Sequence, residues 1–579
     1  YLSGTFAMST ANKRNALNTT AFLDDYIANY GQGYVEDLLY NQGWEMMEDP
    51  ANPGKMLIFK ETDFQDNLFQ TPVNHDFNIN FSGGNEKATY YMSLGYLTQD
   101  GIVVGTHYNR WSFLTNASYK IRKNLTVKGM VNYSMRTTAG INENNVMSRA
   151  AKMPPTVRQY YEDGTPAPGE LTSSFRTRLH EVYYQEKENR VSRINLSAEL
   201  DWEIIPGLHL KPMFSYTNNE GKDHNFERYN EVVKNRPVSE AHNMDLHYQY
   251  DLILNYAKTI KDKHNLDLMV GGNYIYDNWY RFSGSGYGGT SDYIETLNGI
   301  ATESAKTTST FEEKKMNSYF GRVNYNYDNR YLFEFNIRRD GSSRMPKANR
   351  YANFPSFSAA WVLTNESFMQ NVEPLTSFKL RGSWGKLGNQ EIGNYSYAPT
   401  MAAKYNYYFG NQKVIGMADN IVANDKIKWE TTTITDVGFD ASFWKGRISI
   451  TFDWYNKLTS DILLKLAMPY TYIGFLDAPL QNAGKVQNRG WELSANYFDH
   501  KGDFSWNVGF NLSSVRNKIV DDSGGIDQKW ETTINREGYP IGAYYGLKAI
   551  GIYRTEADLN RTNSKGEVIK QDGTMPALG

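Results

Sequence analysis

The chain has 579 residues, and its 61 Lys and Arg against 64 Asp and Glu leave a formal net charge of −3. This balance excludes a nucleic-acid binder that relies on bulk positive charge. Apolar residues make up 40% and aromatic residues 14%, a mixture that suits β-strands with one polar face. Because the chain has no Cys, disulfides, thiolate zinc sites and Cys nucleophiles are excluded together. No apolar run approaches the ~18 residues of a transmembrane helix.

Alternation of apolar and polar residues with a period of two dominates the chain from about residue 75 onward. Clear examples are residues 193–202, 245–256, 447–455 and 504–512. Several runs reach the ~9–11 residues that a membrane-spanning strand needs, whereas strands in soluble proteins average ~5–6. The polar positions predicted to line an aqueous lumen include Arg193, Glu199, Asp245, Gln249, Asp251 and Asp453.

The connections between these runs alternate between short and long. Short connections are expected at residues 122–124, 205–207, 261–264, 328–330, 445–446 and 499–502. Long polar segments are expected at about 137–188, 220–243, 282–314, 388–426, 459–487 and 515–541. Outer-membrane barrels combine short periplasmic turns with long extracellular loops, and such long loops are rare in compact soluble domains.

These patterns predict an all-β protein, a large antiparallel transmembrane β-barrel with about 16–17 strands and long extracellular loops. Residues 1–74 are expected to form an early barrel or extracellular loop segment. Residues 75–579 are expected to form the barrel, incomplete at its C-terminal end. A soluble β-sandwich or propeller with an apolar inner face is the structural alternative.

Signatures of catalysis and of cofactor binding are missing from the sequence. The four Gly-Lys pairs lack the following Ser or Thr of a P-loop. Gly284, Gly286 and Gly289 have dinucleotide-binding spacing but no surrounding parallel βαβ unit, so we expect a loop tip there. His242 and His247 would point to opposite faces of a strand. We therefore expect no enzyme activity, no catalytic or metal-binding residue, no cofactor and no nucleic-acid partner.

Aromatic residues gather in or beside the long segments. Their rings could stack on a sugar or clasp a peptide, or they could pack the loops against one another, and the sequence does not separate these interpretations. The candidate cargo-contacting aromatics are Tyr160, Tyr161, Trp279, Tyr280, Tyr405, Tyr407 and Tyr408.

Several further motifs occur in a fixed order between residues 82 and 493. The most recognisable is the block Arg339-Asp340-Gly341-Ser342-Ser343, in which Asp-Gly is a strong turn signal. Later positions of the set are Gly388, Asn389, Trp429, Glu430, Asn488, Gly490 and Glu492. Taken in order, these segments resemble the barrel of the SusC/RagA family of TonB-linked (TonB-dependent) outer-membrane transporters. We expect all of these positions to be structural. Cargo binding is the alternative for the block from Arg339 to Ser343.

The resemblance implies a family-typical barrel of 22 strands, of which this chain would be the middle part, without the plug domain, the TonB box and the last strands. It also implies a SusD-like surface lipoprotein as a lid and TonB as the energy source, acting through segments absent from this chain. The barrel would cross the outer membrane of a Gram-negative bacterium, in contact with its lipid, and import oligosaccharides or peptides. A passive porin is the alternative function, and a soluble β-rich binding or structural protein is a weaker one.

Overall fold

The computed structural model describes most of the chain, which divides into two units. The described residues are 2–8, 46–48, 56–58, 63–153, 160–161, 164–167, 179–230, 232–369, 372–419, 421–465, 471, 478–522, 527–548 and 554–570. Unit 1 comprises Tyr1–Asp328, Glu334–Asn353 and Ile392–Tyr395. Unit 2 comprises Asn329–Phe333, Phe354–Glu391 and Ser396–Gly579.

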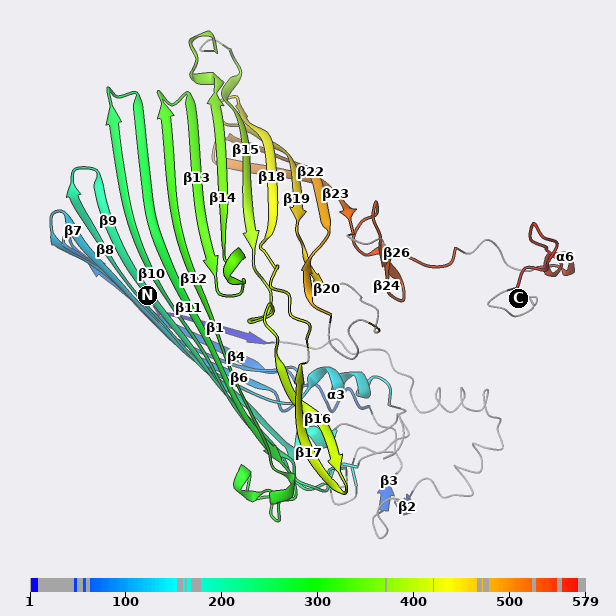
Figure 1. The fold of residues 1–579 in the computed structure, drawn as a ribbon. Helices are drawn as coiled ribbons and strands as arrows, with labels where there is room; N and C mark the ends of the chain where they lie inside the picture. Colours follow the sequence, from blue (N-terminus) through cyan, green and yellow to red (C-terminus); the bar gives the residue numbers. More distant parts are fainter. Residues whose placement is uncertain are drawn as a thin grey trace. The chain divides into compact units, whose positions relative to one another are not determined.

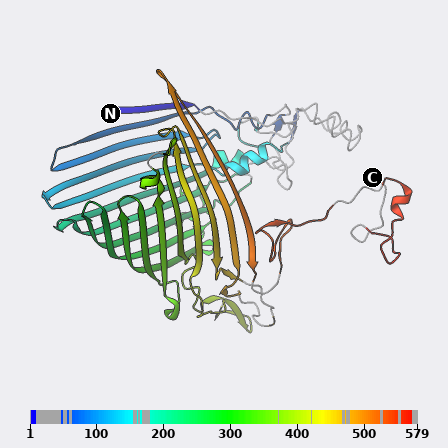
Figure 2. The same ribbon diagram turned by 90° about the horizontal axis from the view of Figure 1, so that it is seen from above.

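Unit 1 is dominated by an antiparallel sheet in which β4 to β12 each pair with the next strand along the chain (Figure 1). Its strands are β1 (Leu2–Met8), β4 (Val73–Gly84), β5 (Ala88–Asp100), β6 (His107–Arg122), β7 (Leu125–Ala139), β8 (Gln185–Ile205), β9 (Leu208–Glu227), β10 (Val238–Ile260), β11 (His264–Gly286) and β12 (Lys306–Tyr327). β1 pairs with β4, with Leu2 opposite Ile79. The short strands β2 (Met46–Glu48) and β3 (Met56–Ile58) form a separate hairpin. Figure 2 shows the long strands of unit 1, coloured blue to green, lying side by side.

Unit 2 is also built on antiparallel neighbours, paired in the order β14, β15, β18, β19, β22 and β23. These strands are β14 (Tyr351–Val362), β15 (Leu375–Asn389), β18 (Glu430–Phe443), β19 (Ile448–Ser460), β22 (Lys485–Lys501) and β23 (Phe504–Asp521). The first residues of β14, and the larger part of β13 (Tyr331–Ser342), belong to unit 1. Smaller strands are β16 (Met401–Phe409), β17 (Gln412–Asp419), β20 (Leu463–Lys465), β21 (Leu480–Asn482), β24 (Gln528–Lys529), β25 (Thr533–Asn535) and β26 (Ala543–Tyr544).

In the described part of the chain, the helices are few and short. They are α3 (Glu143–Ala150), α4 (Leu179–Tyr184) and α6 (Glu556–Leu559), with the 3-10 turns η2 (Leu297–Gly299), η3 (Thr302–Ser304), η4 (Lys347–Asn349), η5 (Leu363–Asn365) and η6 (Ser367–Met369). Among the described residues, no helix has the length and apolar character needed to cross a membrane.

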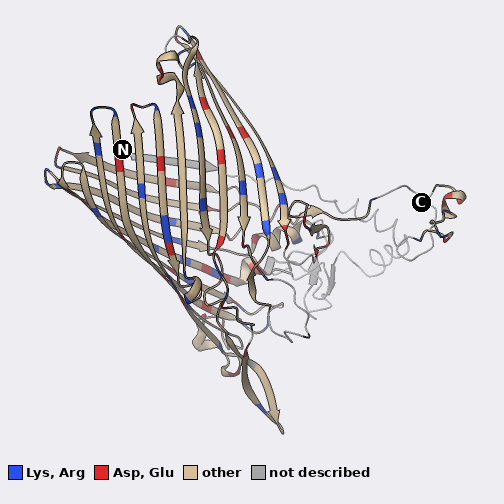
Figure 3. Ribbon diagram, turned by 45° about the horizontal axis from the view of Figure 1, so that its top comes forward, with Lys and Arg blue, Asp and Glu red and all other residues tan. Residues whose placement is uncertain are grey.

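The two-residue period of the sequence gives each sheet one polar and one apolar face. Tyr250 lies opposite Phe214 and Tyr274, and Leu252 lies opposite Gly272, so apolar positions of adjacent strands share a face. On that face Tyr250 is 52% exposed and Leu252 54% exposed. Large exposed apolar surfaces of this kind mark sites of contact with other protein or with a membrane. Charged residues recur along the same strands, as the colours in Figure 3 show.

The short connections adopt the backbone conformations that tight hairpins require. Lys261 and Asp262 join β10 to β11 with φ of 53° and 56°, and Trp444 and Lys445 join β18 to β19 with φ of 51° and 57°. Positive φ at both central residues is the mark of a type I′ turn, whose twist matches that of the flanking strands. The predicted positions of the short connections are confirmed to within three residues, the largest offset being at 499–502, where β22 continues to Lys501.

The predicted long segments were too wide, because the strands continue into them. The segment expected at 220–243 contains the ends of β9 and β10, which stay paired up to Phe226 opposite Val238. Here both faces carry polar side chains, such as His242 beside Glu220, so the alternation that reveals a half-buried strand disappears. Gly284 and Gly286 likewise lie in β11 rather than at a loop tip.

A small apolar core lies among the connections at the same end of unit 1. Leu68, Val103 and Val146 are at most 2% exposed and form one cluster, in which α3 packs on the segments before β4 and after β5. The backbone N–H of Val104 donates to the carbonyl of Leu68 at 3.0 Å, which ties the two segments together. The connections at this end are therefore partly ordered by their own packing.

Candidate functional site

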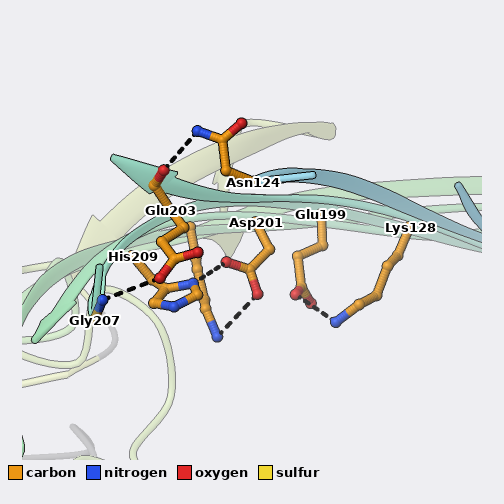
Figure 4. Close-up of polar contacts among 8 residues, drawn as sticks. Asn124, Lys128, Glu199, Asp201, Glu203, Gly207 and His209 are labelled. Atoms are coloured by element: carbon orange, nitrogen blue, oxygen red, sulfur yellow. Dashed lines mark hydrogen bonds and ion pairs between the residues drawn. The ribbon is translucent and has the colours of Figure 1, made fainter. Parts of the chain in front are cut away.

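The polar face of unit 1 carries a ladder of paired charges at its short-turn end (Figure 4). Lys128 Nζ lies 2.9 Å from Glu199 Oε1 across β7 and β8. Asp201 accepts on one oxygen from His209 at 2.6 Å and lies 3.4 Å from Lys211 Nζ on the other. The side chain of Glu203 accepts from the backbone N–H of Gly207 at 3.0 Å. Each cation of this group therefore has a carboxylate partner.

Further along the same face, carboxylates are held by amides and cations from neighbouring strands. Asp277 lies 2.6 Å from His247 Nδ1 and 3.0 Å from Lys314 Nζ, and its side chain is only 13% exposed. Asp251 accepts from Asn273 at 2.6 Å and from Gln249 at 2.7 Å. The predicted lumen positions Arg193, Glu199, Asp245, Gln249 and Asp251 thus share one face of the sheet, as their register requires.

At the long-connection end of this face, three arginines lie in a single cross-strand line. The line runs through directly paired residues of six strands, and we call it the arginine row. Its members are Arg110, Arg136, Val191, Gly221, Asn243 and Arg281. Arg110 and Arg136 are direct neighbours and exposed, and neither forms a side-chain ion pair within the described part of the chain. Arg281 is paired, with Nη1 at 2.5 Å from Asp245 Oδ1.

The arginine row borders a cavity of about 580 Å³. Besides the six row residues, the cavity is lined by Tyr108, Ser134, Asn189, Arg193, Asn219 and Asp245. Arg193 adds a fourth guanidinium, whose Nε donates to Asn195 at 3.2 Å. Asp223, which lies opposite Asn189 and Ala241, is engaged by amides: the side chains of Asn189 and Asn243 donate to it. The cavity lining carries four guanidinium groups and one carboxylate.

The polar face of unit 2 has its own charged centre. Arg381 on β15 donates from Nη2 to Asp453 Oδ2 at 2.8 Å and from Nε to Asp440 Oδ2 at 3.2 Å. Its Nη1 lies 3.7 Å from Asp436. One guanidinium therefore joins carboxylates on β18 and β19. The predicted lumen position Asp453 lies at this centre.

The two long connections that flank β10 and β11 are clasped together by Asp292. Its Oδ1 accepts from the backbone N–H of Tyr229 at 2.9 Å and from Arg236 Nε at 2.6 Å. The Arg236 guanidinium also lies over the Tyr229 ring, 5.0 Å from its centroid. Burial alone would raise the pKa of Asp292, but these hydrogen bonds and the charge of Arg236 outweigh it and hold the pKa below its usual value.

The structure separates the candidate aromatic residues. Trp279 lies opposite Asp245 on the polar face, whereas its neighbour Tyr280 lies on the other face, opposite Met244. Tyr161 is 4% exposed, and its backbone N–H donates to the carbonyl of Thr165 at 2.8 Å. The Tyr160 hydroxyl lies 2.6 Å from that of Tyr183, and burial, followed by this hydrogen bond, raises its pKa.

The other three candidate aromatics lie on the β16–β17 hairpin of unit 2. Tyr407 is 64% and Tyr408 61% exposed, while Tyr405 is half-buried. The role of all seven aromatics in contacting cargo stays a prediction.

The Arg-Asp-Gly-Ser-Ser block contacts neighbouring strands of unit 1. The Arg339 guanidinium lies 5.2 Å from the Tyr351 ring centroid, and Asp340, 6% exposed, accepts from Arg338 Nε at 2.6 Å. A Cβ on Gly341 would lie 2.3 Å from the Tyr351 ring. Ser342 is fully buried, and Ser343 exchanges two hydrogen bonds of 2.9 Å with the backbone of Lys315.

The remaining motif positions make contacts within unit 2. Gly388 faces the Phe354 ring, which packs edge-on against Trp429 at 5.5 Å between centroids. Asn389 donates to Glu430 at 3.4 Å. Asn488 accepts from Asn517 at 2.7 Å, Gly490 has Tyr455 beside it, and Glu492 lies opposite Asp453. A structural role for this set is consistent with these contacts and stays a prediction.

We also searched the described side chains for an arrangement that could bind a metal ion. Within the described ranges, no group of three or more His, Cys, Asp or Glu side chains is arranged to hold a metal ion. His242 and His247, five residues apart on β10, contact Glu220 and Asp277 respectively, on opposite faces of the sheet.

Comparison with known proteins identifies the family to which this chain of long strands belongs. The model of the family described as TonB dependent receptor-like, beta-barrel, matches residues 143–566. The chain belongs to this family. The receptor barrel is 31% identical over 564 residues to TonB-dependent receptor P3 of Formosa agariphila, a match that covers 93% of this chain and 54% of the relative.

Two further relatives carry the family names that the motifs suggested. TonB-dependent receptor SusC of Bacteroides thetaiotaomicron is 27% identical over 508 residues, covering 81% of this chain and 49% of SusC. The structure of the RagAB peptide importer in the open-open state superposes with a TM-score of 0.84 and 22% identity, over 98% of this chain and 67% of that chain. The receptor barrel thus spans about half the length of the curated relatives that it matches. The predicted fold class and family are confirmed.

Family membership assigns the two faces of the sheet. In outer-membrane barrels the lipid face is apolar and the lumen is polar, because no water satisfies polar groups in the hydrocarbon region. Tyr250 and Leu252 therefore face lipid, and the arginine row faces the lumen at the end of the long, extracellular connections.

The arginine row escaped the sequence analysis, although Arg193 and Asp245 beside it were predicted to face the lumen. Arg110, Arg136 and Arg281 are far apart in the sequence, and only the strand register brings them into line. The sequence does contain a weak signal: each of the three arginines stands at the polar phase of an alternating run, and Arg136 and Arg281 stand directly before long connections.

Proposed function

We propose that the receptor barrel is the translocating subunit of a TonB-dependent importer in the outer membrane of a Gram-negative bacterium. It would work with a SusD-like surface lipoprotein as a lid and take up oligosaccharides or peptides. The observation that carries the proposal is the continuous polar face of long strands, set against an exposed apolar face, in a chain of this family. Such a wall can pass hydrated cargo while its exterior contacts lipid.

The energy source and partner rest on the relatives. The curated relatives are named TonB-dependent receptors, and the structural neighbour is titled a peptide importer. TonB would act through segments outside this chain, so no residue here is assigned to it. These names describe receptors and a transporter, and we propose accordingly that the barrel performs no catalysis and needs no cofactor.

Native mass spectrometry of the full-length protein tests this proposal. The complex is purified from outer membranes in detergent without added ligand. A co-purifying lipoprotein together with a bound oligosaccharide or peptide is the expected result. Uptake of that ligand into cells should also stop when TonB is deleted. A barrel without a partner that passes solutes equally well in cells lacking TonB would show a passive porin instead.

A further inference from the structure

Within the described residues, no carboxylate offsets the repulsion between Arg110 and Arg136, two neighbouring members of the arginine row. Arg110 and Arg136 lie directly opposite each other on β6 and β7, where side chains start ~4.5–5.5 Å apart, and like charges in such pairs are destabilising. Neither has a carboxylate partner within the residues that the structure describes. By contrast, Lys128, His209 and Lys211 at the short-turn end of the same face all lie beside carboxylates. The unpaired positive charge is thus concentrated at the entrance end of the lumen.

The residues around these arginines leave room for a ligand and offer it hydrogen-bonding groups. The middle of the row is made of the small residues Val191, Gly221 and Asn243, which leave the cavity of about 580 Å³ between the guanidinium groups. Asn189, Asn219 and Tyr108 add further hydrogen-bonding groups around it. The one carboxylate in the lining of this cavity, Asp245, already forms an ion pair with Arg281. A guanidinium fork matches a carboxylate with two parallel hydrogen bonds, and such charge-assisted bonds are the strong ones.

We propose that the arginine row is a lumenal binding site for carboxylate groups, so that the importer selects cargo that carries negative charge. This inference rests on the proposed function and names the charge of its substrate. The cargo is an acidic peptide or an oligosaccharide that contains uronic acids. Arg110 and Arg136 bind the carboxylates, and Arg281, oriented by Asp245, closes the other end of the row.

Binding to the full-length detergent-purified complex tests this site with two matched pairs of probes. The pairs are hexaglutamate against hexaglutamine, and trigalacturonate against maltotriose. We expect the acidic member of one pair to bind about tenfold or more tightly than its neutral partner, and the preference to weaken as salt rises. Which pair shows the preference distinguishes a peptide from a sugar source of the carboxylate.

Variants connect the preference to the row. Arg110→Gln with Arg136→Gln should remove most of the charge preference, and the double Lys variant should retain part of it. Arg190→Gln is the matched control: Arg190 lies on the opposite face of β8, paired with Glu188 at 3.2 Å, and its loss should change nothing.

Three results would overturn the proposal. They are equal binding of acidic and neutral probes, no binding of any probe, and a preference that survives the double Gln variant. Lower thermal stability of the double Gln complex with an unchanged preference would show that the arginines hold another segment of the full-length protein. All of these outcomes leave the lipoprotein partner and the TonB dependence untouched, so failure of the site and failure of the importer proposal are distinguishable.

Discussion

Arg381 and Asp453 form a bidentate ion pair across β18. Arg381 Nη1 lies 2.5 Å from Asp453 Oδ1, and Arg381 Nη2 donates to Asp453 Oδ2 at 2.8 Å. The two residues lie on β15 and β19, with β18 between them. Asp440 on β18 accepts from the same guanidinium, so a single cation holds carboxylates of two successive strands. Such a centre stabilises the register of three strands at once.

Arg381→Gln should therefore destabilise the barrel by about 1.5 to 3 kcal/mol, because carboxylates with limited solvent access lose their cation. Unfolding of the full-length protein in detergent with increasing urea measures the change. Lys386→Gln removes the same charge from the opposite face of β15 and should change stability little. Equal effects of the two variants would contradict the role given to Arg381.

Phe452→Arg should cost ~2–4 kcal/mol if the change lies near the bilayer midplane. Phe452 lies on the apolar face, stacked with Phe439 at 5.7 Å and Trp491 at 6.4 Å between ring centroids. Reversible unfolding in lipid vesicles gives the free energy. Ser449→Arg, on the polar face of the same strand, is the control. A cost near zero for Phe452→Arg would show that this face does not contact lipid.

Gly388→Ala should destabilise unit 2 by about 1 to 3 kcal/mol through overpacking. A Cβ at this position would lie 2.1 Å from the Phe354 ring, which is itself packed against Trp429. Gly382→Ala on the same strand is the matched control, because there the nearest atom to a new Cβ is 3.7 Å away. The melting temperature of Gly388→Ala should therefore be lower than that of Gly382→Ala. Equal melting temperatures would show that the prediction is wrong.

The clasp formed by Asp292 should weaken in acid. The folded-state pKa is lowered, so the stabilisation is fully present above the unfolded-state pKa of ~3.9 and is lost as pH falls through the lower folded value. Amide hydrogen exchange over residues 228–237 and 287–305 should therefore be slower in the wild type than in Asp292→Asn at neutral pH. The difference should disappear below the folded-state pKa. An unchanged difference in acid would refute the ion pair as its cause.

Trp279→Ala should weaken cargo binding by up to about tenfold, because the ring faces the lumen beside Asp245 and can pack against a ligand. Tyr280→Ala provides the control within the same strand, since Tyr280 lies on the other face. Titration of the purified importer with its co-purified ligand measures both. Equal losses would contradict this assignment of faces.

Much of the barrel could be predicted from local pattern. The period of two in residues 245–256 and the positive-φ turn at Lys261 and Asp262 depend on neighbouring residues only, so strand, face and turn follow from the sequence. Where β9 and β10 leave the apolar environment, both of their faces become polar, and the same pattern underestimated their length.

By itself, the sequence determined the class of protein: the alternation and the ordered motifs led to a TonB-dependent receptor barrel. Only the tertiary structure decided which charges meet. Arg110, Arg136 and Arg281 come from three strands, and their alignment depends on the register of every pair between them, which long-range hydrogen bonds establish. A one-residue slip in any pair would turn a strand's side chains to the other face, so a site made of cross-strand neighbours exists only in the assembled sheet.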